Sequence, residues 1–430
     1  MILFSLLYDV SLFLLGLTFF PFFLYQKIFK GKYSQVFFSK LGCDFPKINT
    51  QERFVIWVHA VSVGETKAVS SLVRSLKKKY KNPLIIISSI TETGHAEAKK
   101  SLACADYHVY LPFDFYWIIT PIVKRVSPNL VIVSETDFWF NFLRAAKKYG
   151  AKIALVNGKM SKKSSRRLKS FSFFSKKLLG LFDLFCIQCD HYLPRFIDAG
   201  VSPRLLVVTG NLKLDDDYPD VKPEELVAWK EGLGIARSDK VIVIGSTHAP
   251  EEKQILEKLK PLWLKDSSLK VVVVPRHPER FEEVATILTD LNLPFTKFSE
   301  PKKRSGNENI VLIDAMGLLR KCYQFADVAI VAGSFSDKIG GHNIVEPCWY
   351  GVPTLFGPHM ETQPNLVKLV EAFKAGEQVT IEDLPKTVHG FLQDNEKRRR
   401  VGDAGIRLAA SSRGATKKTC DLLLKSVSSS

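Results

Sequence analysis

The chain has 430 residues, of which 46% are apolar and 24% are charged. This length fits two or three domains, and the composition excludes both a disordered tail and a polytopic membrane protein. Seven cysteines, an odd number scattered along the chain, do not form a disulfide framework and indicate reduced thiols in the cytosol.

Charge is distributed unevenly between the two halves of the chain. The formal net charge is +17, from 61 Lys and Arg against 44 Asp and Glu. Residues 1–210 hold 30 of the basic and 13 of the acidic residues, and the rest of the chain is neutral. The excess therefore predicts an anionic partner for the N-terminal half, either nucleic acid or anionic lipid at a membrane surface.

The first 26 residues favour the membrane. They hold one charged side chain, Asp9, among many Leu and Phe, and three lysines follow by residue 32. No basic residue precedes the apolar run and no small-residue cleavage site follows it, so we expect an uncleaved single anchor over residues 1–33. The basic flank predicts that the remainder stays on the cytoplasmic face. A buried core helix or a helix lying in the membrane interface is the alternative for so short a run.

After this segment, apolar runs of strand length alternate with helical stretches. Over residues 34–213, strands are predicted at residues 54–59, 84–88, 108–111, 130–134, 152–156, 184–188 and 205–209. Apolar, β-branched strands separated by helices are typical of a parallel sheet covered on both faces. We therefore expect a Rossmann-like domain over residues 34–213.

An acidic, proline-bearing stretch over residues 214–235 interrupts this pattern and is the predicted linker. The alternation then restarts, with strands predicted at residues 240–244, 270–274, 310–313, 328–331 and 354–356. We expect a second Rossmann-like domain over residues 236–400, and a C-terminal helix and tail over residues 401–430. The expected class is α/β, with two Rossmann-like domains facing a cleft and ligands bound beyond the carboxyl ends of the strands.

Three polar residues follow strands of the first domain. Glu65 follows a predicted strand and a Ser/Gly turn, and opens a helix, where it could act as a general base. Glu135 comes directly after the strand ending at Ser134, and Lys213 closes the domain, where it could neutralise phosphate charge. The alternatives are a helix-start acid, a solvated loop acid and a surface lysine.

Two motifs in the second domain favour an anionic ligand. Arg276 and His277 follow a four-valine strand, and a guanidinium there can bind phosphate or carboxylate through two hydrogen bonds. Farther on, Gly340 and Gly341 precede a predicted helix, so that backbone N–H groups can approach an anion. Glu346 is expected on the same helix face as Asn343, suited to a ribose diol.

Other signals are weaker. Cys186 and Cys189 have the spacing of a redox or metal pair, but they lie in an apolar strand without a second pair, so no metal is expected. The basic run at residues 162–169 precedes an apolar, aromatic stretch and suits docking on anionic lipid. A non-catalytic nucleic-acid-binding protein is the alternative, but the chain lacks aromatic RNA-binding motifs.

Taken together, these residues resemble the 3-deoxy-D-manno-octulosonic acid (Kdo) transferases of lipopolysaccharide synthesis, glycosyltransferase family 30. The matching pieces cover most of the chain and run in the family's order: Ser62–Glu65, Ser134–Thr136, Thr209–Lys213, Pro275–Arg280, Asp314–Gly317, Gly333 with Ser334, Gly340–Asn343, Glu346 with Pro347, and Gly357–His359.

The resemblance implies the GT-B fold and an inverting transfer of Kdo from CMP-Kdo to a lipid A precursor (lipid IVA) at the inner membrane, with neither metal nor other cofactor. It leaves open whether Kdo is also added to Kdo already attached. A different GT-B enzyme that uses a UDP-sugar is the alternative, and nucleic acid is not an expected partner.

Specific roles follow from the same resemblance. Glu65 corresponds to the general base, and Glu135 and Lys213 correspond to residues that stabilise the transition state. Many relatives have Glu where this chain has Leu318. The expected CMP contacts are Pro275, Arg276, His277, Met316, Gly317, Leu318, Ser334, Gly341, Asn343, Ile344, Val345 and Glu346.

Overall fold

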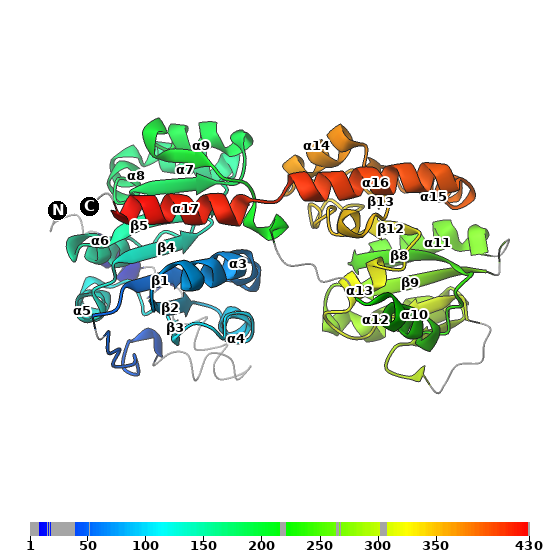
Figure 1. Cartoon of the computed structure of the whole chain (residues 1–430), viewed down its shortest axis with the longest axis horizontal. Coiled ribbons are helices and arrows are strands. Elements are labelled where there is room, and N and C mark those ends of the chain that lie inside the picture. The colour runs from blue at the N-terminus through cyan, green and yellow to red at the C-terminus, as the bar shows by residue number, and fades with distance from the viewer. Residues whose placement is uncertain are drawn as a thin grey trace. The chain divides into compact units, whose positions relative to one another are not determined.

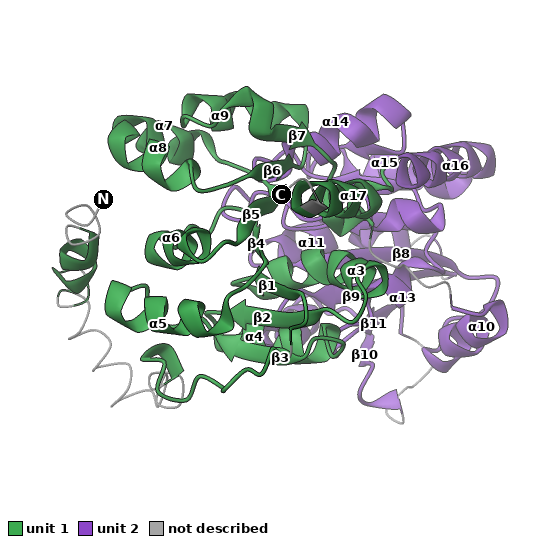
Figure 2. Ribbon diagram, turned by 60° about the vertical axis from the view of Figure 1, so that its left-hand side comes forward, with its two compact units in different colours: residues 1–217, 412–430 green, residues 218–411 purple. Residues whose placement is uncertain are grey.

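The computed structural model describes residues 8–14, 16, 18, 39–50, 52–215, 221–263, 266, 268–301 and 308–428. The chain divides into two compact units, residues 1–217 with 412–430, and residues 218–411 (Figure 2). Each unit is built around one parallel sheet with helices packed on it (Figure 1). The expected α/β class with two Rossmann-like domains is thereby confirmed.

The first unit contains a seven-stranded sheet in the order β3-β2-β1-β4-β5-β6-β7. Its strands are β1 (Val55–His59), β2 (Leu84–Ser89), β3 (Tyr107–Tyr110), β4 (Leu130–Ser134), β5 (Lys152–Gly158), β6 (Leu184–Ile187) and β7 (Leu206–Val208). Its helices are α3 (Val63–Lys79), α4 (Glu92–Ser101), α5 (Tyr116–Val126), α6 (Phe140–Lys148), α7 (Lys162–Ser170), α8 (Ser172–Leu179), α9 (Leu193–Asp198) and α17 (Ala415–Ser428), with the 3-10 helices η1 (Asp190–Tyr192), η2 (Pro203–Leu205) and η3 (Leu212–Leu214).

Both faces of this sheet are buried. Side chains alternate across a strand, so Ile56 and Trp57 of β1 enter different core clusters. The Trp57 cluster includes Phe142 of α6, and the Ile56 cluster includes Leu72 of α3. Strands buried on both faces must be apolar throughout, which explains the continuous apolar runs in the sequence.

The second unit contains a seven-stranded sheet in the order β10-β11-β9-β8-β12-β13-β14. Its strands are β8 (Lys240–Thr247), β9 (Leu269–Pro275), β10 (Phe295–Lys297), β11 (Ile310–Leu312), β12 (Val328–Val331), β13 (Thr354–Phe356) and β14 (Gly376–Gln378). Its helices are α10 (Pro223–Gly232), α11 (Glu251–Trp263), α12 (Phe281–Asp290), α13 (Leu319–Tyr323), α14 (Pro364–Phe373), α15 (Leu384–Gln393) and α16 (Asn395–Ser411), with the 3-10 helices η4 (Pro278–Arg280) and η6 (Pro347–Tyr350).

Two predicted boundaries were wrong. The linker expected over residues 214–235 was too long, because residues 223–232 form α10 of the second unit. The segment expected over residues 401–430 is divided: α16 runs through residue 400 in the second unit, and α17 belongs to the first. Leu423 of α17 lies fully buried in the core that α3 also lines (Figure 1). The apolar face of this last helix is thus covered by the sheet of the other half of the chain.

Part of the expected N-terminal anchor is described. Residues 8–14 are helical, and apart from residues 16 and 18 the rest of the expected segment over residues 1–33 lies outside the described residues. Within the described part of the chain, no helix is both long enough and apolar enough to cross a membrane. The anchor therefore stays a prediction.

Candidate functional site

Glu65 lies in the first turn of α3, directly beyond β1. Ser62 caps this helix: its hydroxyl accepts a hydrogen bond from the Glu65 N–H (3.3 Å) and donates one to Glu65 Oε1 (2.9 Å). The Val61 N–H donates to Glu65 Oε2 (2.9 Å). This reciprocal capping fixes the carboxylate, so the helix-start alternative is also correct as a description of the local structure.

The environment of Glu65 suits a base that works near neutral pH. Its side chain is only 8% exposed, and burial raises its pKa from 4.5 to about 7, with further contributions from the charges of Asp137 and Glu135. The hydrogen bonds from Val61 and Ser62 act in the opposite direction. A carboxylate with such a pKa can both accept and release a proton at physiological pH.

Glu135 follows β4 and is held by two lysines. Lys213 Nζ lies 2.9 Å from Glu135 Oε1, and Lys159 Nζ lies 2.7 Å from Glu135 Oε2. Burial raises the pKa of Glu135, but the two positive charges outweigh it and hold the pKa below its usual range. The neighbouring Asp137 has a raised pKa, from burial and from the charge of Glu135. Glu135 is therefore ionised at neutral pH, because its pKa lies below the usual carboxyl range.

These side chains come together at the middle of the first sheet. β1 and β4 are neighbours there, and the strand order runs outward in opposite directions from this pair. Open parallel sheets bind ligands beyond the carboxyl ends of the strands at such a point. A Cβ on Gly64 would lie 3.9 Å from Lys213 Nζ, so Lys213 reaches the first turn of α3. The three predicted residues, Glu65, Glu135 and Lys213, thus form one site.

The second unit carries a group of basic and imidazole side chains beyond β8 and β9. Arg276 and His277 are exposed directly after β9, and Pro275, at the end of that strand, is buried. His248, after β8, has Nε2 2.8 Å from Nε2 of His342, and its ring lies 5.3 Å from that of His277. Burial lowers the pKa of His342 to about 3, and Arg276 adds to this effect.

The Gly-rich motif does not lead into an α-helix, contrary to the sequence prediction. Residues 344–346 form a turn, and only the four-residue helix η6 follows. Pro347 stands at its start because it has no N–H to continue an earlier helix. Asn343 Oδ1 instead accepts the Val345 N–H at 3.1 Å. The predicted helix dipole is therefore absent at this loop, and the expectation of an anion site there has only the loop backbone and its neighbours to support it.

Glycine is required at two places in this loop region. Gly333 has φ +74°, and a Cβ there would overlap the ring of His342. Gly341 has φ +90°, and a Cβ would overlap Met360. A side chain at either position would strain the backbone and displace its neighbour, so the loop has a fixed shape.

Glu251 of α11 holds the loop after β12 through hydrogen bonds to its backbone. This fully buried carboxylate accepts hydrogen bonds from the N–H groups of Gly333 (2.6 Å) and Phe335 (2.7 Å). Ser334 is also fully buried: its hydroxyl donates to Val331 O (2.6 Å) and accepts from the Gly357 N–H (2.7 Å). The Ser334 side chain therefore supports the loop instead of facing solvent.

The remaining predicted CMP contacts differ in accessibility. Met316 is exposed, and Leu318 packs against the core of the second unit. Gly317, also exposed, has φ +86° with open space around it. A ligand can reach the backbone here, whereas Leu318 offers no polar side-chain contact.

The side chains of Ile344 and Val345 are buried, which also leaves only their backbone for a ligand. Glu346 is partly exposed and pairs with Arg320 at 3.6 Å.

Sequence patterns missed three residues of these sites: Lys159, His248 and Glu251. The one sequence signal that could have identified them is their position after a strand. Lys159 comes directly after β5, and His248 and Glu251 follow β8. Among the described residues, no group of three or more His, Cys, Asp or Glu is arranged to hold a metal ion.

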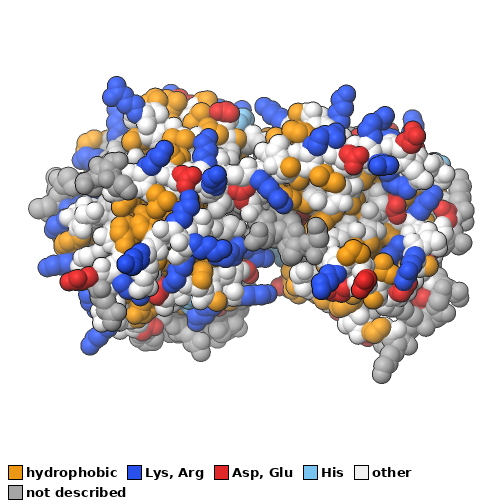
Figure 3. Space-filling view, viewed as in Figure 1, with side chains coloured by type: hydrophobic (Ala, Val, Ile, Leu, Met, Phe, Trp, Pro, Cys, Tyr) orange, Lys and Arg blue, Asp and Glu red, His pale blue; other side chains and the backbone are white. Residues whose placement is uncertain are grey.

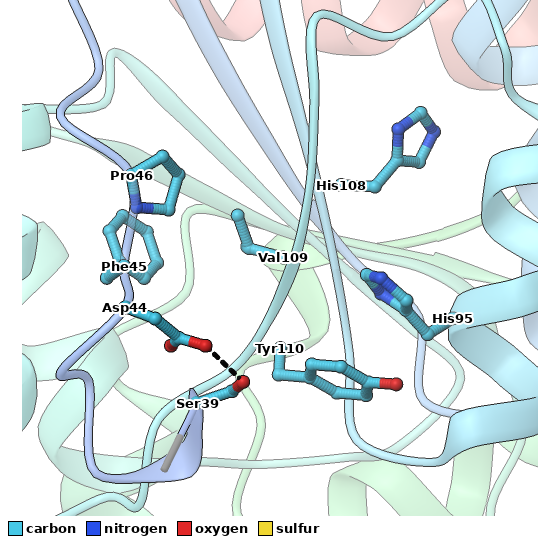
Figure 4. Close-up of a pocket in the computed structure, with 8 residues that line it drawn as sticks. All are labelled: Ser39, Asp44, Phe45, Pro46, His95, His108, Val109 and Tyr110. Atoms are coloured by element: carbon cyan, nitrogen blue, oxygen red, sulfur yellow. Dashed lines mark hydrogen bonds between the residues drawn. The ribbon is translucent and has the colours of Figure 1, made fainter. Parts of the chain in front are cut away.

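A cavity of about 210 Å³ lies elsewhere in the first unit, beside β3 (Figure 4). Ser39 donates a hydrogen bond to Asp44 at its rim (2.6 Å), and the rings of His95 and Tyr110 stack with centroids 4.2 Å apart. None of the predicted site residues lines this cavity. It therefore contributes nothing to the assignment of the site.

The chain is similar to known proteins of one family. A family model described as 3-deoxy-D-manno-octulosonic-acid transferase matches residues 36–216. The 3-deoxy-D-manno-octulosonic acid transferase of Chlamydophila psittaci is 32% identical over 397 residues, covering 92% of this chain and 90% of that protein. That of Haemophilus influenzae is 31% identical over 372 residues, covering 86% of each.

Among solved structures, a glycosyltransferase from Rickettsia africae is similar with a TM-score of 0.64 at 14% identity, covering 88% of this chain and 100% of that one. UDP-GlcNAc 2-epimerase from Neisseria meningitidis gives a TM-score of 0.61 at 14% identity, covering 86% and 100%. These two likenesses show the fold alone, which is the expected GT-B type. The identity to curated relatives over most of its length shows more: the chain belongs to the 3-deoxy-D-manno-octulosonic acid transferases.

Proposed function

We propose that this chain transfers Kdo from CMP-Kdo to a lipid A precursor, with inversion at the anomeric carbon. The observation that carries the proposal is the buried Glu65 carboxylate, whose pKa is about 7, beside an ionised Glu135 held by two lysines. Such a pair provides a base for a hydroxyl and a fixed negative charge for a developing carbocation.

The proposed step is a single displacement. A hydroxyl of the acceptor attacks the anomeric carbon of Kdo from the face opposite CMP, and its proton passes to Glu65. The bond from that carbon to the phosphate oxygen breaks, and its electron pair leaves with CMP. Glu135 stabilises positive charge at the anomeric carbon, and Lys213 neutralises the anionic groups of the substrates.

The second unit supplies the binding groups for CMP in this proposal. Arg276 is exposed and can bind the phosphate through two hydrogen bonds, with His277 and His248 beside it. Glu346 can accept hydrogen bonds from the ribose hydroxyls. We infer that the Arg276 guanidinium takes the place of a metal in neutralising the leaving group, so we expect transfer to continue in excess EDTA.

Activity is tested with the full-length chain in detergent, CMP-Kdo and a purified lipid A precursor, with the product followed by mass spectrometry. We expect one or more Kdo additions, and the number of additions defines the acceptor range. Glu65→Gln should reduce turnover by about 10²–10⁴-fold, the usual contribution of a general base. Wild-type turnover by this variant would exclude Glu65 as the base.

We also propose that the first unit docks on an anionic membrane, at the inner face where the acceptor lies. Large apolar side chains are exposed on its N-terminal helix, on α5, and at the start of α8: Val10, Phe13, Leu14, Tyr116, Trp117, Phe171 and Phe173. Arg144 lies over the ring of Tyr116, and Lys177 lies 4.0 Å from the centroid of Phe173. Aromatic side chains flanked by cations suit the interface of an anionic bilayer.

Contacts of the N-terminal helix place these elements side by side. Tyr8 donates a hydrogen bond to Asp114 (3.0 Å), and its ring stacks on Phe174 of α8. Asp9 accepts from Asn141 Nδ2 of α6 (2.7 Å) and from the Tyr116 N–H of α5 (3.3 Å). Figure 2 shows this helix beside α5 and α6, and Figure 3 shows Lys and Arg side chains spread over one face of the unit. The helix therefore joins the apolar surface of its neighbours.

Vesicle sedimentation tests the docking surface. We expect the double variant Trp117→Ser with Phe173→Ser to bind anionic vesicles at least 10-fold more weakly than the wild type, because each large side chain contributes about 1.5–3 kcal/mol when fully buried. Ile406→Ser is the matched control, since Ile406 is similarly exposed but belongs to the second unit. Equal binding by the double variant and the control would contradict the proposal.

Another GT-B enzyme that uses a UDP-sugar is the second candidate, since UDP-GlcNAc 2-epimerase has a similar fold and the fold alone does not fix the nucleotide. CMP and UDP differ in the base and in the number of phosphates, so thermal unfolding in the presence of each separates the two candidates. A ligand that binds the folded state alone raises the unfolding temperature, and at equal concentration the tighter ligand raises it more. We expect stabilisation by CMP and little by UDP, and the reverse would favour the second candidate.

A further inference from the structure

We propose that Lys159 is a positioning residue for the transfer reaction: it holds Glu135 in place and ionised, so that Lys213 can turn to an anionic group of the substrates. This inference rests on the function proposed above. It assigns a role to a residue outside the motifs that carry the family resemblance.

The two lysines contact different oxygens of one carboxylate. Lys159 lies 2.7 Å from Oε2 and Lys213 lies 2.9 Å from Oε1. Glu135 itself is only 7% exposed, and its backbone has φ +59°, a conformation that side-chain-bearing residues adopt at a cost of about 1–3 kcal/mol. Because each oxygen has its own cation, Lys159 can keep the carboxylate oriented when Lys213 moves.

The backbone around Lys159 is fixed on both sides. Asn157, with φ +54°, lies where the pairing of β5 with β6 shifts register, and this irregularity redirects the chain at the end of β5. Its side chain accepts the Leu212 N–H at 3.0 Å and so also holds η3, which carries Lys213. On the other side, Arg195 donates to Met160 O at 2.7 Å. The fold therefore directs both lysines at Glu135.

The charges around Glu135 explain why Lys213 alone does not keep this carboxylate ionised as fully as Lys159 and Lys213 do together. The ionisable groups that face Glu135 come from several elements: Glu65 of α3, Asp137 after β4, Lys159 after β5, Tyr192 of η1 and Lys213 of η3. Three of these six side chains, counting Glu135, are acids in a confined space. With Lys159 removed, Glu135 loses one of the two cations that oppose the effect of burial, so its pKa rises relative to the wild type. A larger fraction of the carboxyl is then protonated at any given pH.

A direct role in substrate binding is the competing explanation, because the Lys159 side chain is 41% exposed. The two roles predict different kinetics. A lysine that binds substrate changes KM for that substrate, whereas a lysine that holds Glu135 changes kcat and its pH dependence. Arginine, with the same charge and a reach similar to that of lysine, should restore the second role.

The experiment compares Lys159→Met and Lys159→Arg with the wild type in full-length protein, measuring Kdo transfer to the lipid A precursor from pH 5 to 9. Lys100→Met, at an exposed position in α4, is the matched control, and thermal unfolding checks the fold of each variant. We expect Lys159→Met to lower kcat by about 10- to 100-fold at pH 7, the loss typical of a charge-assisted hydrogen bond, with KM for both substrates within about twofold.

The pH profile of kcat distinguishes the positioning role of Lys159 from a role in substrate binding. For Lys159→Met, we expect the acid limb of the kcat profile, which Glu65 sets near pH 7, to become steeper because protonation of Glu135 adds to that of Glu65, and for Lys159→Arg to return toward the wild type. An unchanged limb, or a raised KM with unchanged kcat, would overturn the positioning role. If the wild type itself transferred no Kdo, the proposed function would fail first, so the two failures are distinguishable.

Discussion

Replacing Glu65 by Gln separates the two roles that the structure gives this residue, as a helix cap and as a base. Gln has the same shape, its oxygen can accept the Val61 N–H, and its amide can donate to the Ser62 hydroxyl, so the capping of α3 survives. What disappears is the ionisable group. If the cap were the whole role of Glu65, the variant would be neutral or slightly less stable at every pH.

The raised pKa of Glu65 predicts a different and pH-dependent result. Between pH 4.5 and about pH 7 the folded state binds the Glu65 proton more tightly than the unfolded state does, so wild-type stability falls as pH rises through this window. The shift corresponds to at most about 3 kcal/mol, or an unfolding temperature lower by roughly 6 to 12 °C for a domain of this size. Gln is neutral at every pH, so the variant does not lose stability in this pH window.

Thermal unfolding of wild type and Glu65→Gln at pH 5 and pH 8 measures the effect, and turnover is measured in parallel. We expect similar stability at pH 5, higher stability of the variant at pH 8, and a turnover loss of about 10²–10⁴-fold at pH 8. The wild-type kcat profile should fall below about pH 7, as Glu65 becomes protonated. A variant that is less stable by the same amount at both pH values would refute the reasoning.

Three further predictions concern other described residues. Gly333→Ala should destabilise the second unit by about 1–3 kcal/mol and abolish the rise in unfolding temperature caused by CMP, since its Cβ would overlap His342. Arg276→Ala should leave the unfolding temperature unchanged without CMP, but weaken CMP binding by about 10- to 100-fold in calorimetry, because the exposed guanidinium is a charged hydrogen-bond donor. Asp9→Ala should speed hydrogen exchange at the Tyr116 amide by about 5- to 150-fold, since it removes an acceptor of that N–H.

The sheets were predictable from sequence because their strands are buried on both faces. The runs ending at Ser134 and at Val331 have the bounds that the sequence predicted. The three-residue strands β10 and β14 were missed, since each lies at an edge of the second sheet and neither contains an apolar run: β10 is Phe-Thr-Lys and β14 is Gly-Glu-Gln. Local pattern cannot distinguish these two strands from loops, whereas the edge strands β3 and β7 of the first sheet were predicted.

Long-range pairing was beyond the reach of local pattern. The helix at the C-terminus is amphipathic by sequence, but nothing nearby in the chain says that Leu423 joins the core beneath α3. Lys159 likewise looks like any surface lysine until Glu135, 24 positions earlier, is placed opposite it. The predicted helix after Gly341 failed for a local reason that the sequence does contain, the proline at position 347.

The apolar pattern of the sequence also does not predict the backbone conformation at the carboxyl ends of the strands, where the proposed catalytic residues lie. Glu135, Asn157 and Ser246 all have φ between +54° and +59°, and each lies at or just beyond the end of a central strand. Glu135 and Ser246 each cost about 1–3 kcal/mol relative to an ordinary backbone conformation, and Asn157 costs less because Asn adopts this region more readily. Two of the three have a direct part in the site, because Glu135 carries the ion pairs and Asn157 holds the helix of Lys213. A strand that continued straight would carry these side chains along the sheet, whereas the left-handed turn directs them across its end. The large buried cores offset this strain, which is why the apolar pattern predicts the strands but not the geometry of the residues that follow them.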